Sequence, residues 1–127
     1  MQAIGSAASD RFAELLGVET LHSSFDQTVC RLRVRDEQRN ALGGIHGGLI
    51  FALADIAFAA ACNAGEATYI GLQAEVRYMA QAQGDELTAS ATRMGGSRRI
   101  AHYQVLVSDA LANPIALFTA SAYRLAN

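Results

Sequence analysis

The chain has 127 residues, of which 51% are hydrophobic and 17% are charged, and its formal net charge is −2. This length allows one domain with one core and excludes a two-domain enzyme, and the apolar fraction excludes a disordered chain. The near-neutral charge argues against a general nucleic-acid or membrane-surface binder. The 25 alanines are an excess of small apolar residues, which predicts close packing, in part against more than the chain itself.

The first part of the chain predicts a short helix within residues 1–16, which Ser9 or Asp10 can cap and Gly17 can end. No basic region followed by an apolar stretch begins the sequence, so we expect no signal peptide and a soluble, cytoplasmic protein. The two cysteines, Cys30 and Cys62, are too few for a disulfide framework, and their spacing fits no zinc site. We therefore expect two buried thiols and no metal.

The remaining pattern predicts one long helix and a set of strands. Polar and apolar residues alternate over residues 28–35, which indicates a half-buried strand. Residues 46–64 predict a helix that is apolar on almost every side, as is typical of a helix enclosed by protein. Four more strands joined by short turns favour antiparallel pairing. They are expected at residues 73–78, 87–94, 100–107 and 115–123. The predicted fold class is α+β, an antiparallel β-sheet wrapped around one long central α-helix, in a single domain over residues 1–127.

Two features of the long helix can carry chemistry. Asp55 has only apolar helical neighbours, so an ionised carboxylate there is costly and is a candidate for reactive chemistry. Alternatively, Asp55 faces a wet patch or bonds to a strand backbone. The motif His46-Gly47-Gly48 begins the helix, where unpaired N–H groups and the helix dipole can hold an anion or a developing oxyanion, although such glycines also serve turn geometry. Asp55 lies nine residues after His46, roughly 12–14 Å along the axis, so a second chain is expected to complete the site.

The motif from Asn40 through His46-Gly47-Gly48 to Asp55 resembles the signature of hotdog-fold acyl-CoA thioesterases, and within them the PaaI-type branch of phenylacetic acid degradation. The resemblance extends from about Gly17 to the C-terminus. It implies a hydrolase acting on a small aryl- or short- to medium-chain acyl-CoA, without a separate cofactor because coenzyme A is part of the substrate. It also implies a homodimer that completes the active site, and two such dimers in a tetramer.

The resemblance further implies a role for each motif residue. The Gly47 N–H is expected to donate to the oxyanion, and Asp55 of the partner subunit to act as nucleophile or as general base on water. Asn40 is expected to position the water or polarise the thioester carbonyl, and His46 to orient Asn40 or its loop. The residues expected to contact the phosphates of coenzyme A are Gly96, Ser97 and Arg98, with Arg93 and Arg99 as weaker candidates.

The sequence departs from the family at Gly71 and Ala59, where relatives often carry a hydroxyl residue. Two other functions stay open: a non-catalytic acyl-CoA-binding or regulatory module on the same fold, and an acyl-thioester hydratase or dehydratase. The isolated Asp55 disfavours a pure binding module. A hydratase generally needs a paired histidine and carboxylate, and His46 has no such acid nearby in the sequence. Tyr69, Tyr78 and Met79 are each expected to pack in the core, with an acyl-pocket role as the alternative.

Overall fold

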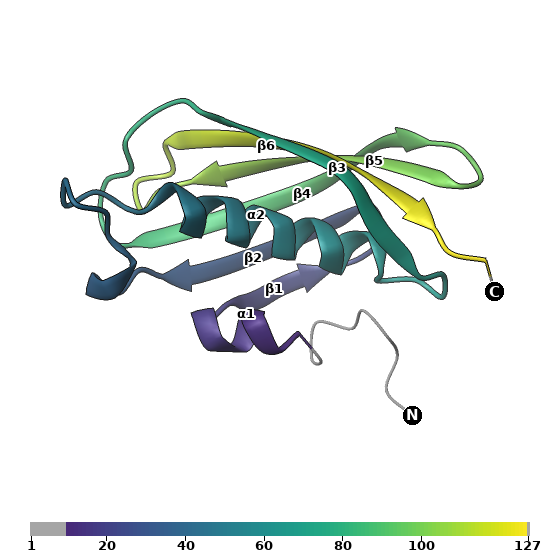
Figure 1. The fold of residues 1–127 in the computed structure, drawn as a ribbon, viewed down its shortest axis with the longest axis horizontal. Helices are drawn as coiled ribbons and strands as arrows, with labels where there is room; N and C mark the ends of the chain where they lie inside the picture. Colours follow the sequence, from purple (N-terminus) through teal and green to yellow (C-terminus); the bar gives the residue numbers. More distant parts are fainter. Residues whose placement is uncertain (1–9, 127) are drawn as a thin grey trace.

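The computed structural model describes residues 10–126, and Figure 1 shows them as one curved sheet that holds a single long helix against one face. The six strands pair antiparallel in the order β1-β2-β4-β5-β6-β3. This confirms the predicted α+β class. The elements are α1 (Arg11–Leu16), β1 (Glu19–Ser23), β2 (Gln27–Arg33), a 3-10 helix (Asp36–Gln38), α2 (Gly47–Cys62), β3 (Tyr69–Tyr78), β4 (Glu86–Gly96), β5 (Ile100–Ser108) and β6 (Pro114–Arg124).

The ends of both α-helices follow from local chemistry. Asp10 caps α1, because its Oδ1 accepts a hydrogen bond from the Ala13 N–H at 2.9 Å, and Gly17 ends α1 with a φ of 77°. The alternative cap, Ser9, and the rest of the predicted N-terminal segment lie outside the described residues. The central helix is shorter than the predicted 46–64, because His46 is its N-cap and Asn63 its C-cap.

The core lies between the sheet and α2. The strand predicted for residues 87–94 is confirmed, and Leu87, Ala89 and Ala91 are fully buried on the face of β4 that meets the helix. One predicted turn is wrong: Gly95 and Gly96 belong to β4, and the turn to β5 falls on residues 97–99. Glycine pairs alone indicate a turn, but the pairing of β4 with β5 extends the strand past them.

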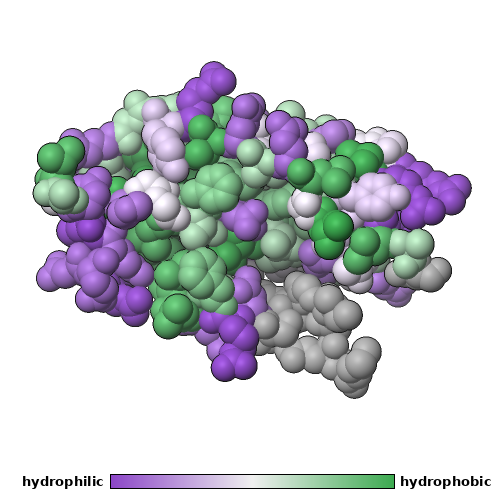
Figure 2. Space-filling model, in the orientation of Figure 1, coloured by the Kyte–Doolittle hydropathy of each residue, from purple (hydrophilic) through white to green (hydrophobic). Residues whose placement is uncertain are grey.

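The expectation that protein encloses α2 on every side is only partly met by residues 10–126. The sheet covers one side of the helix, and a stripe on the other side is left open, with Gly48 and Asp55 exposed and Ala52 and Ala59 half-buried. Figure 2 shows hydrophobic side chains gathered over the middle of this face, with hydrophilic ones around them. A helix with apolar residues on its open side requires further cover, which the chain's own sheet does not provide.

Strand β3 forms one edge of the sheet. Among the described residues it pairs with β6 alone, which leaves its outer side unpaired, and nearly all of its 10 residues are exposed. Ile70 and Leu72 are 48% and 56% exposed. An edge strand of this length presents a row of free N–H and C=O groups, which can pair with another chain.

Asp109 ties two loops together at the end of the sheet. Its buried carboxylate accepts hydrogen bonds from the Gln83 N–H at 2.8 Å and the Leu111 N–H at 3.0 Å, and from both nitrogens of Asn113. Burial by itself raises the pKa of this carboxyl, but the hydrogen bonds from Gln83, Asn113 and Leu111 together bring the pKa below its ordinary value. The ionised form is therefore the one that the fold stabilises.

Replacing Asp109 with asparagine is expected to lower the melting temperature at pH 7, because one acceptor oxygen and the charge are lost. The folded pKa lies below the unfolded one, so the stabilisation is present above the ordinary carboxyl range and is lost as the pH falls through the folded pKa. Calorimetry at pH 7 and near pH ~3 should show the difference between variant and parent shrinking in acid. The control is Asp85→Asn, which removes an exposed ion pair with Arg33. Equal losses for both variants would contradict the assignment.

Candidate active site

The first turn of α2 leaves one backbone donor available. The His46 Nδ1 accepts a hydrogen bond from the Gly48 N–H at 2.9 Å, and the His46 carbonyl accepts from the Leu49 N–H at 3.0 Å. Among the described residues, the Gly47 N–H has no hydrogen-bond acceptor. This N–H lies at the positive end of the helix dipole and, with no side chain on Gly47, a ligand oxygen can approach it closely. It can therefore stabilise a developing oxyanion.

Tyr78, at the end of β3, lies against the start of α2. Its hydroxyl donates a hydrogen bond to the Gly47 carbonyl at 3.0 Å. A Cβ on Gly47 would lie 3.3 Å from the Tyr78 ring and hydroxyl, so a side chain at this position would press on the tyrosine. Tyr78 is 53% exposed, and the expectation that it packs in the core is therefore wrong. The β-strand pattern could not show this contact, because the two residues are 31 positions apart.

The loop before α2 is built around Asn40. Its Oδ1 accepts hydrogen bonds from the Leu42 N–H at 3.0 Å and the Gly44 N–H at 3.1 Å, and this fixes the loop. The Nδ2 donor of Asn40 has no acceptor within the described part of the chain, so it can donate to a water or a carbonyl. No hydrogen bond in that same part joins His46 to Asn40. The imidazole of His46 caps the helix, and the backbone N–H of His46 donates to the Gln38 carbonyl at 3.0 Å.

Asp55 stands in the middle of the open stripe on α2 and is exposed, not enclosed as the sequence pattern indicated. No ion pair between described residues includes Asp55. Partial burial by the surrounding protein raises the pKa of this carboxyl, and the nearby Asp10 carboxylate raises the pKa further. The argument against a pure binding module therefore rests on a carboxylate that neighbouring protein makes more basic, and not on a fully buried charge.

Gly47 and Asp55 do not meet on one substrate atom within a chain. They are eight residues apart on a single helix, which is about 12 Å along its axis. A carbonyl held at the Gly47 N–H is therefore out of reach of Asp55 from the same chain. His46 and Gly47 stand at the start of the helix, Asn40 lies in the loop before it, and Asp55 is half-way along.

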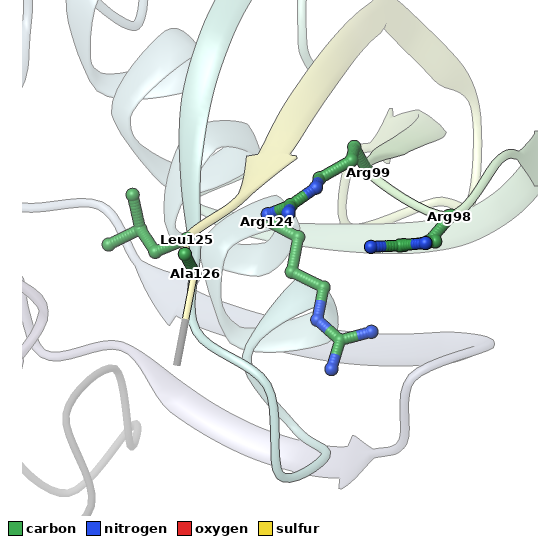
Figure 3. A pocket seen from close by; sticks show the side chains of 5 residues that line it. All are labelled: Arg98, Arg99, Arg124, Leu125 and Ala126. Carbon is green, nitrogen blue, oxygen red and sulfur yellow. The ribbon is translucent and has the colours of Figure 1, made fainter.

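A second cluster lies at the other end of the molecule, where the β4–β5 turn meets the end of β6 (Figure 1). Figure 3 shows the side chains of Arg98, Arg99 and Arg124 around a pocket of about 210 Å³. None of these arginines pairs with a carboxylate among the described residues. Such unpaired guanidinium groups suit phosphate groups. A side chain on Gly96 would collide with the Ile100 carbonyl, so the hairpin itself requires this glycine.

The arginine cluster differs from the one predicted. Arg93 does not line the pocket; its guanidinium lies over the Phe25 ring, 5.3 Å from the centroid, so it stabilises the packing there. Arg124 was missed by the sequence motif. The signal was in the strand register, because the pairing of Ile100 with Tyr123 places Arg99 beside Arg124, and the Arg124 N–H donates to the Arg99 carbonyl at 2.8 Å.

The cysteines offer no alternative nucleophile. Cys30 and Cys62 are free and buried, as predicted. Burial raises the pKa of the Cys62 thiol to about 12, and it also raises the pKa of Cys30, so neither is a thiolate at neutral pH. Within residues 10–126 no three His, Cys, Asp or Glu side chains gather as metal ligands. No helix in the same range combines the length and apolar character needed to cross a membrane.

Comparisons with known proteins agree with this geometry. A family model described as "Domain of unknown function (DUF4442)" matches residues 15–110. The chain is 31% identical over 118 residues to a protein of Archaeoglobus fulgidus named "Putative esterase", covering 92% of this chain and 77% of that protein. It is 26% identical over 118 residues to the acyl-coenzyme A thioesterase PaaI of Escherichia coli, covering 92% and 84%. The solved structure of the TT0310 protein from Thermus thermophilus has a TM-score of 0.83 and 36% identity, covering 91% and 98%.

The antiparallel sheet curved around α2 is the hotdog fold, and the likeness to the PaaI proteins identifies a thioesterase of the PaaI-like type. The likeness to the solved PaaI protein of E. coli, with a TM-score of 0.88 over 94% of this chain, supports the same class. The chain belongs to the DUF4442 family.

Proposed function

We propose that this protein hydrolyses the thioester bond of a small aryl- or short- to medium-chain acyl-CoA, releasing the free acid and coenzyme A. The observation that carries the proposal is the pair of complementary groups on α2. One is the Gly47 N–H, which has no acceptor among the described residues, and the other is Asp55, whose pKa is raised. Thioester hydrolysis needs little else, because a thiolate leaves readily once the oxyanion is stabilised.

Each group has one task in this reaction. The Gly47 N–H donates a hydrogen bond to the carbonyl oxygen, which becomes negative as the carbon turns tetrahedral. Asp55 either attacks the carbonyl carbon or takes a proton from a water that attacks it. The tetrahedral intermediate then collapses, the C–S bond breaks, and the thiolate of coenzyme A leaves and takes up a proton. If Asp55 is the nucleophile, water hydrolyses the resulting anhydride in a second step. The Asn40 Nδ2 is the donor available to position the water or polarise the carbonyl.

A homodimer formed through β3 would complete this site. The unpaired edge of β3 can pair antiparallel with a second copy, and the open stripe of α2 lies beside it as further apolar surface. An antiparallel pair exchanges the two ends of the molecule, so Asp55 of one chain approaches Gly47 of the partner subunit. The same exchange carries the arginine pocket towards the helix start of the other copy, although the two lie at opposite ends of one chain (Figure 1). Pairing of two dimers into a tetramer completes the proposed assembly.

The arginine pocket is proposed to bind the phosphates of the nucleotide part of coenzyme A. Replacing Arg124 with alanine is expected to raise KM for acyl-CoA about tenfold and leave kcat nearly unchanged, because one charge-assisted hydrogen bond is lost far from the reacting carbonyl. The measurement is steady-state kinetics with an acyl-CoA and with the matching acyl-pantetheine, which lacks the nucleotide. KM for the pantetheine thioester should stay unchanged. Arg33→Ala, on an exposed arginine outside the pocket, is the control, and an equal rise in KM for both thioesters would contradict the assignment.

Thiol release over a panel of aryl- and alkanoyl-CoA thioesters tests the function itself. Release of free coenzyme A in proportion to enzyme is the expected result, and the rate across the panel identifies the acyl group. A change in enoyl absorbance without free thiol would instead indicate a hydratase. Saturable acyl-CoA binding without turnover would indicate the binding module. Light scattering on the same sample measures the mass of the assembly against the 13.5 kDa of one chain.

A further inference from the structure

We propose that Tyr78 is a positioning residue that holds the oxyanion-hole peptide of Gly47 in its productive orientation. The catalytic role of Tyr78 rests on the proposed function, whereas its contact with Gly47 is a feature of the structure itself. The Tyr78 hydroxyl donates to the Gly47 carbonyl at 3.0 Å, and its ring lies against the Gly47 Cα. Tyr78 contributes no group to the carbonyl that reacts; it acts through Gly47.

The peptide unit between Gly47 and Gly48 is held at both ends. Tyr78 donates to its carbonyl oxygen, and the His46 Nδ1 accepts from its N–H at 2.9 Å. The preceding peptide unit, which carries the Gly47 N–H, is anchored through its own carbonyl by the Leu49 N–H. These three hydrogen bonds together fix the two peptide planes on either side of the Gly47 Cα.

This anchoring matters because two consecutive glycines begin the helix. Glycine has the greatest backbone freedom, so Gly47 and Gly48 lose the most entropy when they are ordered. An oxyanion donor is effective only if it already points at the place where charge develops. Without the hydroxyl of Tyr78, the Gly47 carbonyl keeps only the hydrogen bond that α2 itself provides, so the Gly47–Gly48 peptide is held less firmly and the Gly47 N–H is less well oriented before the substrate binds.

The chain offers a matched set of variants. Tyr78→Phe removes the hydroxyl and keeps the ring. Gly47→Ala keeps the N–H and adds a Cβ at 3.3 Å from Tyr78, so its effect should pass through the tyrosine, and Tyr78→Ala removes that contact. Tyr123→Phe is the control, because Tyr123 is also on the surface and its hydroxyl bonds to no described residue.

Tyr78→Phe is expected to lower kcat about fivefold with KM nearly unchanged, since one neutral hydrogen bond is lost and the substrate contacts stay. Gly47→Ala should lower kcat in the parent but have little further effect in the Tyr78→Ala background. The inference is overturned if the losses in kcat caused by Gly47→Ala and by Tyr78→Ala multiply in the double variant. It is also overturned if Tyr78→Phe has the kcat of the parent. A loss of activity that only follows the folded fraction, measured by thermal unfolding, would also overturn it.

A second readout separates this inference from the proposed function. Amide hydrogen exchange and NMR order parameters report the mobility of the Gly47 and Gly48 N–H groups without any substrate. Tyr78→Phe should increase that mobility, and Tyr123→Phe should not. Increased mobility in a protein that cleaves no acyl-CoA would remove the proposed function and keep the positioning contact. Unchanged mobility would overturn the role of Tyr78 whatever the activity.

Discussion

Replacing Asp55 with asparagine is expected to lower kcat for acyl-CoA hydrolysis by about 10²–10⁴-fold without unfolding the protein. The amide has nearly the shape of the carboxylate but can neither attack the carbonyl nor take a proton from water. The substitution should also raise the melting temperature at pH 7, because the raised pKa of Asp55 means that the fold disfavours its ionised form. That gain should shrink as the pH falls below the ordinary carboxyl range, where Asp55 is neutral in both the folded and unfolded states.

The pH profile gives a control for the Asp55 assignment. Hydrolysis requires ionised Asp55, so the acid limb of kcat/KM should lie above the ordinary carboxyl pKa. The Asp10 carboxylate contributes to the raised pKa, and Asp10→Asn should therefore move the acid limb to lower pH while the plateau rate is kept. If Asp55→Asn has the kcat of the parent, or if the acid limb does not move in Asp10→Asn, a group other than Asp55 does the chemistry.

Replacing Gly47 with proline is expected to lower kcat by about 10²–10³-fold, because proline removes the one backbone N–H assigned to the oxyanion. The position tolerates proline on backbone grounds. Gly47 is the first residue of α2, where the N–H has no helical partner, and His46 has φ −63° and ψ 131°, which suits a residue before proline. Gly47→Ala is the matched control, since it meets the same tyrosine but keeps the donor. Single-turnover kinetics measure both variants, and equal losses would mean that crowding, not the missing N–H, is responsible.

The two inactive variants can complement each other if each site is shared. A mixed dimer of Asp55→Asn and Gly47→Pro chains contains one site with a native Gly47 from one chain and a native Asp55 from the other. Random exchange of subunits makes half of the dimers mixed, with one intact site of two, so about one quarter of the parent activity should return. The measurement is hydrolysis before and after the two proteins are unfolded and refolded together. No recovery, despite mixed dimers seen by mass spectrometry, would place the whole site within one chain.

The fold was predictable wherever local pattern and burial coincide. The alternation of Leu87, Ala89 and Ala91 identified the face of β4 that meets the helix, and the cap at Asp10 followed from its side chain. The exposure of Asp55 could not be predicted, because hydrophobic periodicity shows that a helix is apolar but not which of its sides the chain's own sheet covers. Gly96 was misplaced for a related reason: strand pairing with Ala101 outweighs the local turn preference of glycine.

The candidate site was predictable only in its contiguous part. The sequence motif placed His46 and Gly47 at the start of the helix and Asn40 in the loop before it, as the structure does. Contacts between segments that are distant in the sequence could not be predicted from the motif, because they depend on how the strands pass the helix. The Tyr78 hydroxyl on Gly47 is one such contact, and the approach of Arg124 to Arg99 is another. In both cases strand pairing and packing, rather than motif spacing, determine the neighbour.

The free edge of β3 bears on the aggregation of the protein as well as on its proposed activity. Until it finds a partner, the chain exposes 10 residues of strand beside an apolar helix face, and such edges template aggregation. In the proposed dimer, pairing of that edge would protect the chain and complete the site in the same event. Dilution below the dissociation constant of the dimer should then reduce the turnover per chain.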